Sequence, residues 1–401
     1  MSTTQTEFDR LEQELADTGV DGVLDQLVAQ LREKKKYHEL FEALKMRVRH
    51  RLGLPITYSD SGDELDEPQR NGLEEGLIDA CREVGMLLLQ DGSAREGWMY
   101  MRPVGERSAV AKELEKIEVT DETVEELIEV CLHEGVDPAR GYALVLEHYG
   151  TCNAITTYES SVARHPIPDQ RAAAGLLVTH LHNELLSTVR ADIAQKEGTE
   201  PTEDTLAELV NDRDWMFGEH SYHIDTTHLA STVRFSRILE DPETLRLALD
   251  LTVYGRRLSS QFQYQGDEPF GDIYPSNAFY LGALLGENVD EAIAYFRNKV
   301  NELDADEHGS QPMEALVQLL DRVDRPNEAI DTLIEFCEDP QQEDTQVIPI
   351  LLELSEKMGD FAKVKDLCRK RGDVLGCASG VTQASNQGCY RRHRETGAST
   401  T

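Results

Sequence analysis

Long apolar runs are absent from this sequence of 401 residues. No segment approaches the ~18 consecutive apolar residues that a membrane-spanning helix needs. The N-terminal stretch MSTTQTEFDRLEQEL lacks the basic start, apolar centre and small-residue cleavage site of a secretory signal, and its pattern is that of an amphipathic helix. We therefore expect a cytoplasmic protein that has no membrane partner.

Cysteine is scarce and has no recognisable pattern. The seven cysteines, an odd number, include no CxxC pair and no spacing typical of a zinc site. Scattered cysteines of this kind are small buried hydrophobes or free thiols, which persist in a reducing compartment. The cysteines therefore agree with a cytoplasmic location.

Positive charge is in short supply. The chain has 76 Asp and Glu residues against 40 Lys and Arg residues, which gives a formal net charge of −36. Such an excess of acid repels nucleic acids and anionic membrane surfaces along most of the chain. We expect no nucleic-acid partner.

The common catalytic signatures are missing as well. The sequence contains no GxxxxGK[ST], no GxGxxG after a strand, no GxSxG and no HExxH. Phosphate cradles and nucleophile elbows belong to turns between strands and helices, and strand-like alternation is nearly absent here. The sequence therefore disfavours enzymes built on α/β sheets, and we expect no cofactor.

Helical periodicity is what the sequence does contain. Between residues 20 and 52 apolar side chains recur at steps of three and four residues, as in Val23, Leu24, Leu27, Val28 and Leu31. The same pattern predicts helix pairs along most of the chain, interrupted by a polar, acidic loop at residues 58–70. The sequence thus predicts an all-α fold.

The turns between these helices resemble one another. Segments such as GVDPARGYALV, GENVDEAIAYF and VDRPNEAIDTL each lead into a helix with a small or aliphatic residue near its start. Aligning them places six residues at one equivalent site, where the paired helix should approach closely: Leu40, Gly97, Gly141, Ala292, Ala329 and Val364. Ala329 follows Ala292 by 37 residues, and Val364 follows Ala329 by 35. Periods of this length indicate a solenoid of helical hairpins.

The segments GDFAKVKDL and RPNEAIDTLIEF are similar to the turn and second helix of tetratricopeptide repeats. This resemblance implies a right-handed superhelical solenoid of antiparallel helix hairpins. We expect N-terminal hairpins at 1–165, an irregular helical middle segment at 166–268, tetratricopeptide-like repeats at 269–372 and a disordered tail at 373–401, which is rich in Gly, Ser and Thr.

Two groups of residues are candidates for a partner-binding surface. One contains Trp98, Tyr100 and Arg102, and the other contains Arg140 and Tyr142. Tyr, Trp and Arg on a concave face are typical of binding hot spots, although helical spacing also suits a core position for Trp98. They support the main hypothesis, a non-enzymatic adaptor or scaffold that binds a protein or peptide.

A histidine cluster in the middle segment offers an alternative. His220, His223, Asp225 and His228 lie within ten residues, and His180 could join them if the helices pack side by side. Imidazoles and a carboxylate could ligate a divalent metal ion and support a metal-dependent enzyme or metal-binding module. The simpler interpretation is that Asp225 caps the following helix and the histidines are polar surface or core groups.

Overall fold

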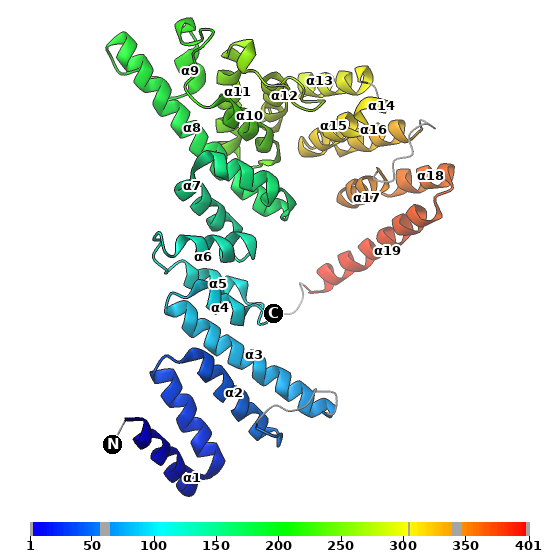
Figure 1. The fold of residues 1–401 in the computed structure, drawn as a ribbon. Coiled ribbons are helices and arrows are strands. Elements are labelled where there is room, and N and C mark those ends of the chain that lie inside the picture. Colours follow the sequence, from blue (N-terminus) through cyan, green and yellow to red (C-terminus); the bar gives the residue numbers. More distant parts are fainter. Residues whose placement is uncertain (1–2, 57–64, 304, 339–346, 398–401) are drawn as a thin grey trace. The chain divides into compact units, whose positions relative to one another are not determined.

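A computed structural model describes residues 3–56, 65–303, 305–338 and 347–397. This part of the chain contains helices, turns and one isolated β-bridge between Gln265 and Asp272, but no strand. The prediction of an all-α fold is confirmed for these residues. The chain divides into two compact units, Met1–His165 and Pro166–Thr401, and each is described by itself (Figure 1).

The first unit is a succession of helices joined mostly by short turns. In chain order these are α1 (Thr3–Glu33), α2 (Tyr37–Arg51), α3 (Glu67–Gln90), α4 (Ala94–Met101), α5 (Arg107–Leu114), α6 (Val124–Ile128), the short π-helix η2 (Glu129–His133), α7 (Pro138–Ser160) and η3 (Val162–Arg164). Each of α1 to α4 packs on the next helix of the chain. Neighbours in sequence are therefore neighbours in space, as in a solenoid.

The second unit begins with less regular elements: α8 (Ile167–Glu197), α9 (Leu206–Val210), η4 (Asp214–Met216), α10 (Thr226–Phe235), η5 (Ser236–Ile238), α11 (Pro242–Arg257) and η6 (Ser260–Phe262). Helix pairs follow: α12 (Ile273–Leu284) with α13 (Val289–Glu302), then the single turn α14 (Ala305–His308), α15 (Gln311–Arg322) with α16 (Pro326–Glu338), α17 (Val347–Met358) with α18 (Ala362–Arg371), and α19 (Val374–Gly397). One core cluster of buried residues runs through these pairs from Phe270 to Cys368.

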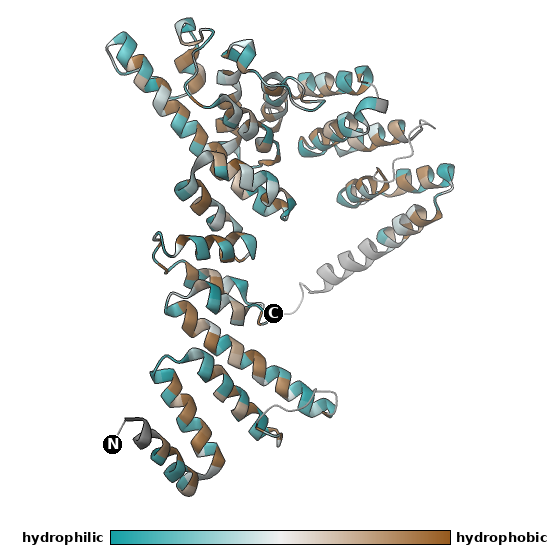
Figure 2. Ribbon diagram, in the orientation of Figure 1, coloured by the Kyte–Doolittle hydropathy of each residue, from teal (hydrophilic) through white to brown (hydrophobic). Residues whose placement is uncertain are grey.

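Each helix buries one stripe of its surface against its neighbours. Hydrophobic and hydrophilic residues are interleaved along the same helices in Figure 2, as expected for helices that are half covered. All six residues aligned from the repeated turns are buried. A Cβ atom on Gly97 would lie only 2.6 Å from Leu89 Cγ, so α3 and α4 approach so closely there that a larger residue would clash. The equivalent site is thus a helix contact point.

The acidic segment was predicted to be a loop throughout residues 58–70, but α3 already begins at Glu67. The carboxylate of Asp66 accepts a hydrogen bond from the amide of Gln69 at 2.8 Å, and Pro68 occupies the first helical turn. Both features are typical helix starts. Residues 57–64 lie outside the described residues.

The tail also differs from the prediction of disorder, because residues 374–397 are helical. The carboxylate of Asp373 accepts a hydrogen bond from the amide of Gly376 at 2.9 Å and caps this helix. Gly376 and Gly380 are buried, and α19 packs on α17 and α18. Small residues, which suggested disorder, here provide a flat face for close helix packing.

Candidate functional site

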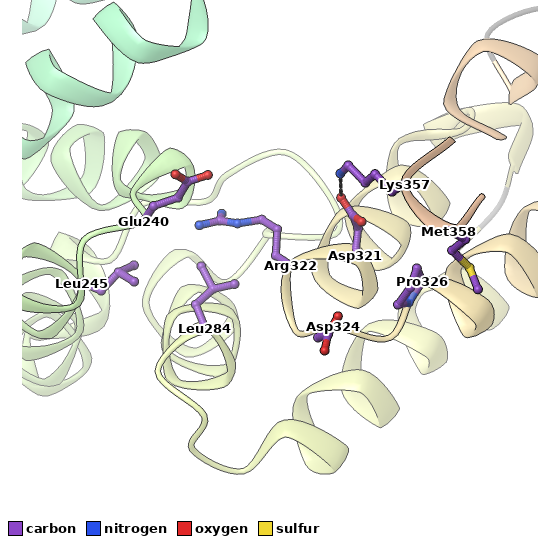
Figure 3. A pocket seen from close by; sticks show the side chains of 9 residues that line it. All are labelled: Glu240, Leu245, Leu284, Asp321, Arg322, Asp324, Pro326, Lys357 and Met358. Carbon is purple, nitrogen blue, oxygen red and sulfur yellow. Dashed lines mark hydrogen bonds and ion pairs between the residues drawn. The ribbon is translucent and has the colours of Figure 1, made fainter. Parts of the chain in front are cut away.

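A pocket of about 480 Å³ lies in the second unit (Figure 3). Its walls come from the C-terminal ends of α12, α15 and α17, together with the segment that leads into α11. Pockets that bind small molecules or anchor side chains commonly have volumes of ~300–1,000 Å³. The size therefore suits one or two side chains of a partner.

The turns that position these walls follow from local sequence. Asp241 accepts a hydrogen bond from the amide of Thr244 at 2.9 Å, and Pro242 fills the first turn, so α11 begins at a fixed point. After α15 the chain reverses through Asp324, whose φ of 61° lies in the left-handed region that Asp tolerates better than most residues. Pro326 then starts α16. Each boundary places a charged residue beside the pocket.

Four apolar side chains line the pocket. Leu245 is buried, while Leu284, Pro326 and Met358 are partly exposed. They come from four helices of the second unit. They offer an aliphatic surface that a partner could cover, which would remove apolar area from water.

The other lining residues are charged, and both cations are already engaged within the chain. Arg322 donates hydrogen bonds to the backbone oxygens of Arg237 and Leu239, and its guanidinium lies 5.8 Å from the centre of the Tyr280 ring. Lys357 forms an ion pair with Asp321. These contacts hold the two positive charges in place along the wall, and Figure 3 shows the pair of Lys357 with Asp321.

The carboxylates of the pocket are less completely neutralised. Glu240 pairs with Arg171 at 2.7 Å, yet its side chain remains 60% exposed. Asp324 is exposed, and within the described part of the chain its carboxylate forms no ion pair. The C-terminal ends of α12, α15 and α17 bring partial negative charge to the pocket, and the N-terminal ends of α11 and α16 bring partial positive charge. The pocket thus combines an aliphatic wall with two exposed carboxylates, of which Asp324 has no ion pair within the described residues.

A second cavity, of about 610 Å³, lies in the first unit between the end of α3 and the segment around Thr120. Two of its three acids are ion-paired, and the third, Glu118, is exposed. Asp91 pairs with Lys35 and accepts a hydrogen bond from Tyr37, and these contacts hold the pKa of the Asp91 carboxyl below its usual value. Glu113 pairs with Lys116 on the same wall. Two apolar side chains, Leu89 and Ile117, line this cavity, against four in the pocket of the second unit.

Two of the five residues predicted to bind a partner are core residues. Trp98 is 5% exposed, and its indole Nε1 donates a hydrogen bond to Glu134 at 3.0 Å. Tyr142 is fully buried, its hydroxyl donates to the backbone oxygen of Ala154 at 3.0 Å, and burial raises its pKa. Both side chains therefore pack within the helix stack and not on an exposed surface, and with no partner present their role in binding stays a prediction.

The other three lie nearer the surface. Tyr100 is half-buried, with its hydroxyl 2.9 Å from His38 Nδ1 and its ring edge against Phe41. Arg102 is exposed and pairs with Glu134 at 3.0 Å, and Arg140 is half-buried. No partner is present to test them, so their role in binding stays a prediction.

The structure does not bring the middle histidines together. His223 lies between Asp192, 3.1 Å from Nε2, and the hydroxyl of Tyr254, 2.9 Å from Nδ1. His180 faces Glu184 on its own helix at 3.8 Å, whereas His220 is exposed.

Asp225 caps α10 by accepting hydrogen bonds from the hydroxyl and amide of Thr227, and these bonds lower its pKa. His228 belongs to the first turn of the same helix and donates its amide to that carboxylate. Among the residues that the structure describes, no group of three or more His, Cys, Asp or Glu side chains could hold a metal ion. The described residues therefore do not support the hypothesis of a metal site at residues 180–228.

One buried polar network was missed by sequence reasoning. Asp250 accepts hydrogen bonds from the amides of Leu206 and Ala207 and from Nε2 of His182, each at 2.8 Å. It fastens the start of α9 to α8 and α11. An aspartate in mid-helix gives no local sign of such a role, because its partners are more than 40 residues away.

Comparisons with known proteins give little further information. No family model matches the chain, and no curated protein matches it. A solved structure described as a circular tandem repeat protein with novel repeat topology and enhanced subunit contact surfaces is 14% identical, with 98% of this chain and 94% of that chain covered and a TM-score of 0.17. At this TM-score the likeness says nothing about function. Among the described helices, none is long and apolar enough to cross a membrane.

Proposed function

We propose that this chain is a non-enzymatic scaffold of tetratricopeptide-like helix pairs that binds a protein or peptide. The observation that carries the proposal is the pocket at the ends of α12, α15 and α17. It is formed by helix ends of successive pairs, and it combines aliphatic and charged lining residues. Helical-repeat proteins commonly present surfaces of this kind to a peptide.

The tetratricopeptide-like assignment rests on the C-terminal pairs. The helix pairs α15 with α16 and α17 with α18 carry the segments that resemble this family, and Ala329 and Val364 are buried at equivalent sites. A cytoplasmic location agrees with the five cysteines whose side chains the structure describes, because none of them forms a disulfide with another. The negative net charge favours a protein or peptide over a nucleic acid as the partner.

A displayed library of random peptides, selected on the purified full-length chain, tests the proposal. We expect a subset of sequences to be enriched and to bind saturably when measured by calorimetry. Bound peptide should slow hydrogen exchange in the segments that line the pocket. The proposal fails if no peptide is enriched over an unrelated acidic protein used as control.

Enzyme assays can contradict the scaffold hypothesis. If the purified chain catalysed hydrolysis or group transfer, and the activity was lost on replacing His182 or His223, the scaffold hypothesis would be wrong. Both histidines already have protein partners, so we expect their replacement to affect stability alone.

A further inference from the structure

We infer that the pocket of the second unit binds a basic, aliphatic peptide segment, in which an Arg or Lys side chain lies next to Leu, Ile or Val. This inference rests on the proposed function and specifies the chemistry of the partner. It follows from three features of the pocket: the charge of its rim, the state of its own cations and the nature of its apolar wall.

The rim attracts a positive charge. Glu240, Asp321 and Asp324 supply three carboxylates to the lining. Glu240 pairs with Arg171 and Asp321 pairs with Lys357, so Asp324 is the carboxylate of this lining that has no ion pair within the described residues. A guanidinium or ammonium group can bind both carboxylates and carbonyl oxygens.

The cations that line the pocket do not neutralise the carboxylate of Asp324. Arg322 is bound to the backbone oxygens of Arg237 and Leu239, and Lys357 is bound to Asp321. Neither forms an ion pair with Asp324 within the described residues. The exposed carboxylate of Asp324 is therefore the position at which an incoming cation gains most. Glu240, which pairs with Arg171 but is 60% exposed, can provide a second contact.

The apolar wall favours a partner that carries aliphatic groups as well as a positive charge. Leu284, Pro326 and Met358 are partly exposed beside these carboxylates. Arg and Lys have aliphatic stems that pack on apolar surfaces while their charged ends reach a polar rim. A neighbouring aliphatic residue of the same peptide would cover the remaining surface, and this combination distinguishes the pocket from a uniformly acidic face.

The test uses four short synthetic peptides and the full-length chain. In the first peptide arginines alternate with leucines; the second has glutamines and the third glutamates in place of the arginines, and the fourth has alanines in place of the leucines. Binding is measured by fluorescence polarisation for the wild type, for the double variant Glu240→Gln with Asp324→Asn, and for the control Glu291→Gln with Glu335→Gln. The control residues are exposed and lie outside the pocket, and their replacement changes net charge equally.

We expect the arginine and leucine peptide to bind best and to weaken as salt is added. The pocket variant should lower its affinity about five- to tenfold, as the loss of two exposed charge contacts implies, and the control should leave it nearly unchanged. Asn tolerates the left-handed backbone of position 324, so the variant should keep the turn.

Three results would overturn the inference. One is equal weakening by the pocket and control variants, which would show that general charge alone attracts the peptide. Another is equal binding of the alanine peptide, which would remove the role of the apolar wall. The third is enrichment of acidic or neutral sequences alone from the random library, which would overturn the inference but leave the proposed function supported. If the library yields no binder, the proposed function itself fails.

Discussion

At the scale of residues, buried polar groups fix the irregular part of the second unit. The hydroxyl of Tyr254 accepts a hydrogen bond from the amide of His223 at 3.0 Å and contacts Nδ1 of the same residue, and Tyr254 is fully buried. Tyr254→Phe keeps the aromatic ring but removes the hydroxyl, so the amide and Nδ1 of His223 lose their hydrogen-bond partner. We expect a loss of about 1–3 kcal/mol in local stability and faster hydrogen exchange at residues 217–225.

Tyr264→Phe is the matched control for that substitution. Tyr264 is 41% exposed, and its hydroxyl lies 3.3 Å from that of Thr226. Because water can replace this contact, we expect a change within about 0.5 kcal/mol. Equal effects of the two substitutions would contradict the structural role assigned to Tyr254.

Asp225 gives the second unit a pH dependence of known sign. The hydrogen bond from the Thr227 hydroxyl is the largest cause of its lowered pKa, so the folded state favours the carboxylate. This contribution to stability is full above the usual pKa of 3.8 and is lost as pH falls through the lower pKa of the folded state.

Replacing Asp225 by Ala removes the cap of α10, and we expect a cost of about 1 kcal/mol at pH 7. Asp225→Asn retains a capping side chain without the charge and should cost less. Urea unfolding of the three proteins measures this, and the advantage of the wild type over Asn should vanish in acid. A constant advantage down to the most acidic pH tested would contradict the role of the charge.

At the scale of elements, α19 is where composition and structure disagree most. A Cβ atom on Gly380 would lie 3.5 Å from Val364 Cγ1 and 3.8 Å from Leu352 Cδ2, which is ordinary contact. Gly380→Ala should therefore stabilise α19 by about 0.5–1 kcal/mol, because alanine favours helix. Gly380→Leu should clash with α17 and α18 and separate α19 from them.

Hydrogen exchange of residues 374–385 measures both substitutions. Protection should increase in the alanine variant and decrease in the leucine variant. Thr382→Leu, at an exposed position of the same helix, is the control and should change little. Unprotected amides over these residues in the wild type would show that the helix does not form and that composition predicted the tail correctly.

At the scale of the whole molecule, sequence predicts what depends on neighbours along the chain. Periodicity gave the helix pairs, and the six aligned residues, from Leu40 to Val364, are all buried. The pocket could not be predicted this way, because Glu240, Leu284, Asp324 and Met358 come from segments far apart in sequence. Trp98 shows that residue type alone does not predict a binding site. A tryptophan suits a binding hot spot and a buried core equally, and only the packing of the folded chain decides between them.

Net charge also acts on the whole chain. With 76 acidic and 40 basic residues, one-to-one pairing would leave 36 acids without a basic partner, so repulsion outweighs the exposed ion pairs. Added salt weakens both the repulsion among the acids and the attraction within the ion pairs. At 0.1 M, screening is nearly complete between exposed charges more than ~10 Å apart. Because the repulsion is the larger of the two energies, its loss decides the net effect. We expect the thermal midpoint to rise with NaCl by about 2–4 °C for each kcal/mol gained. KCl should have the same effect, whereas a midpoint that falls with either salt would mean that ion pairs outweigh the repulsion.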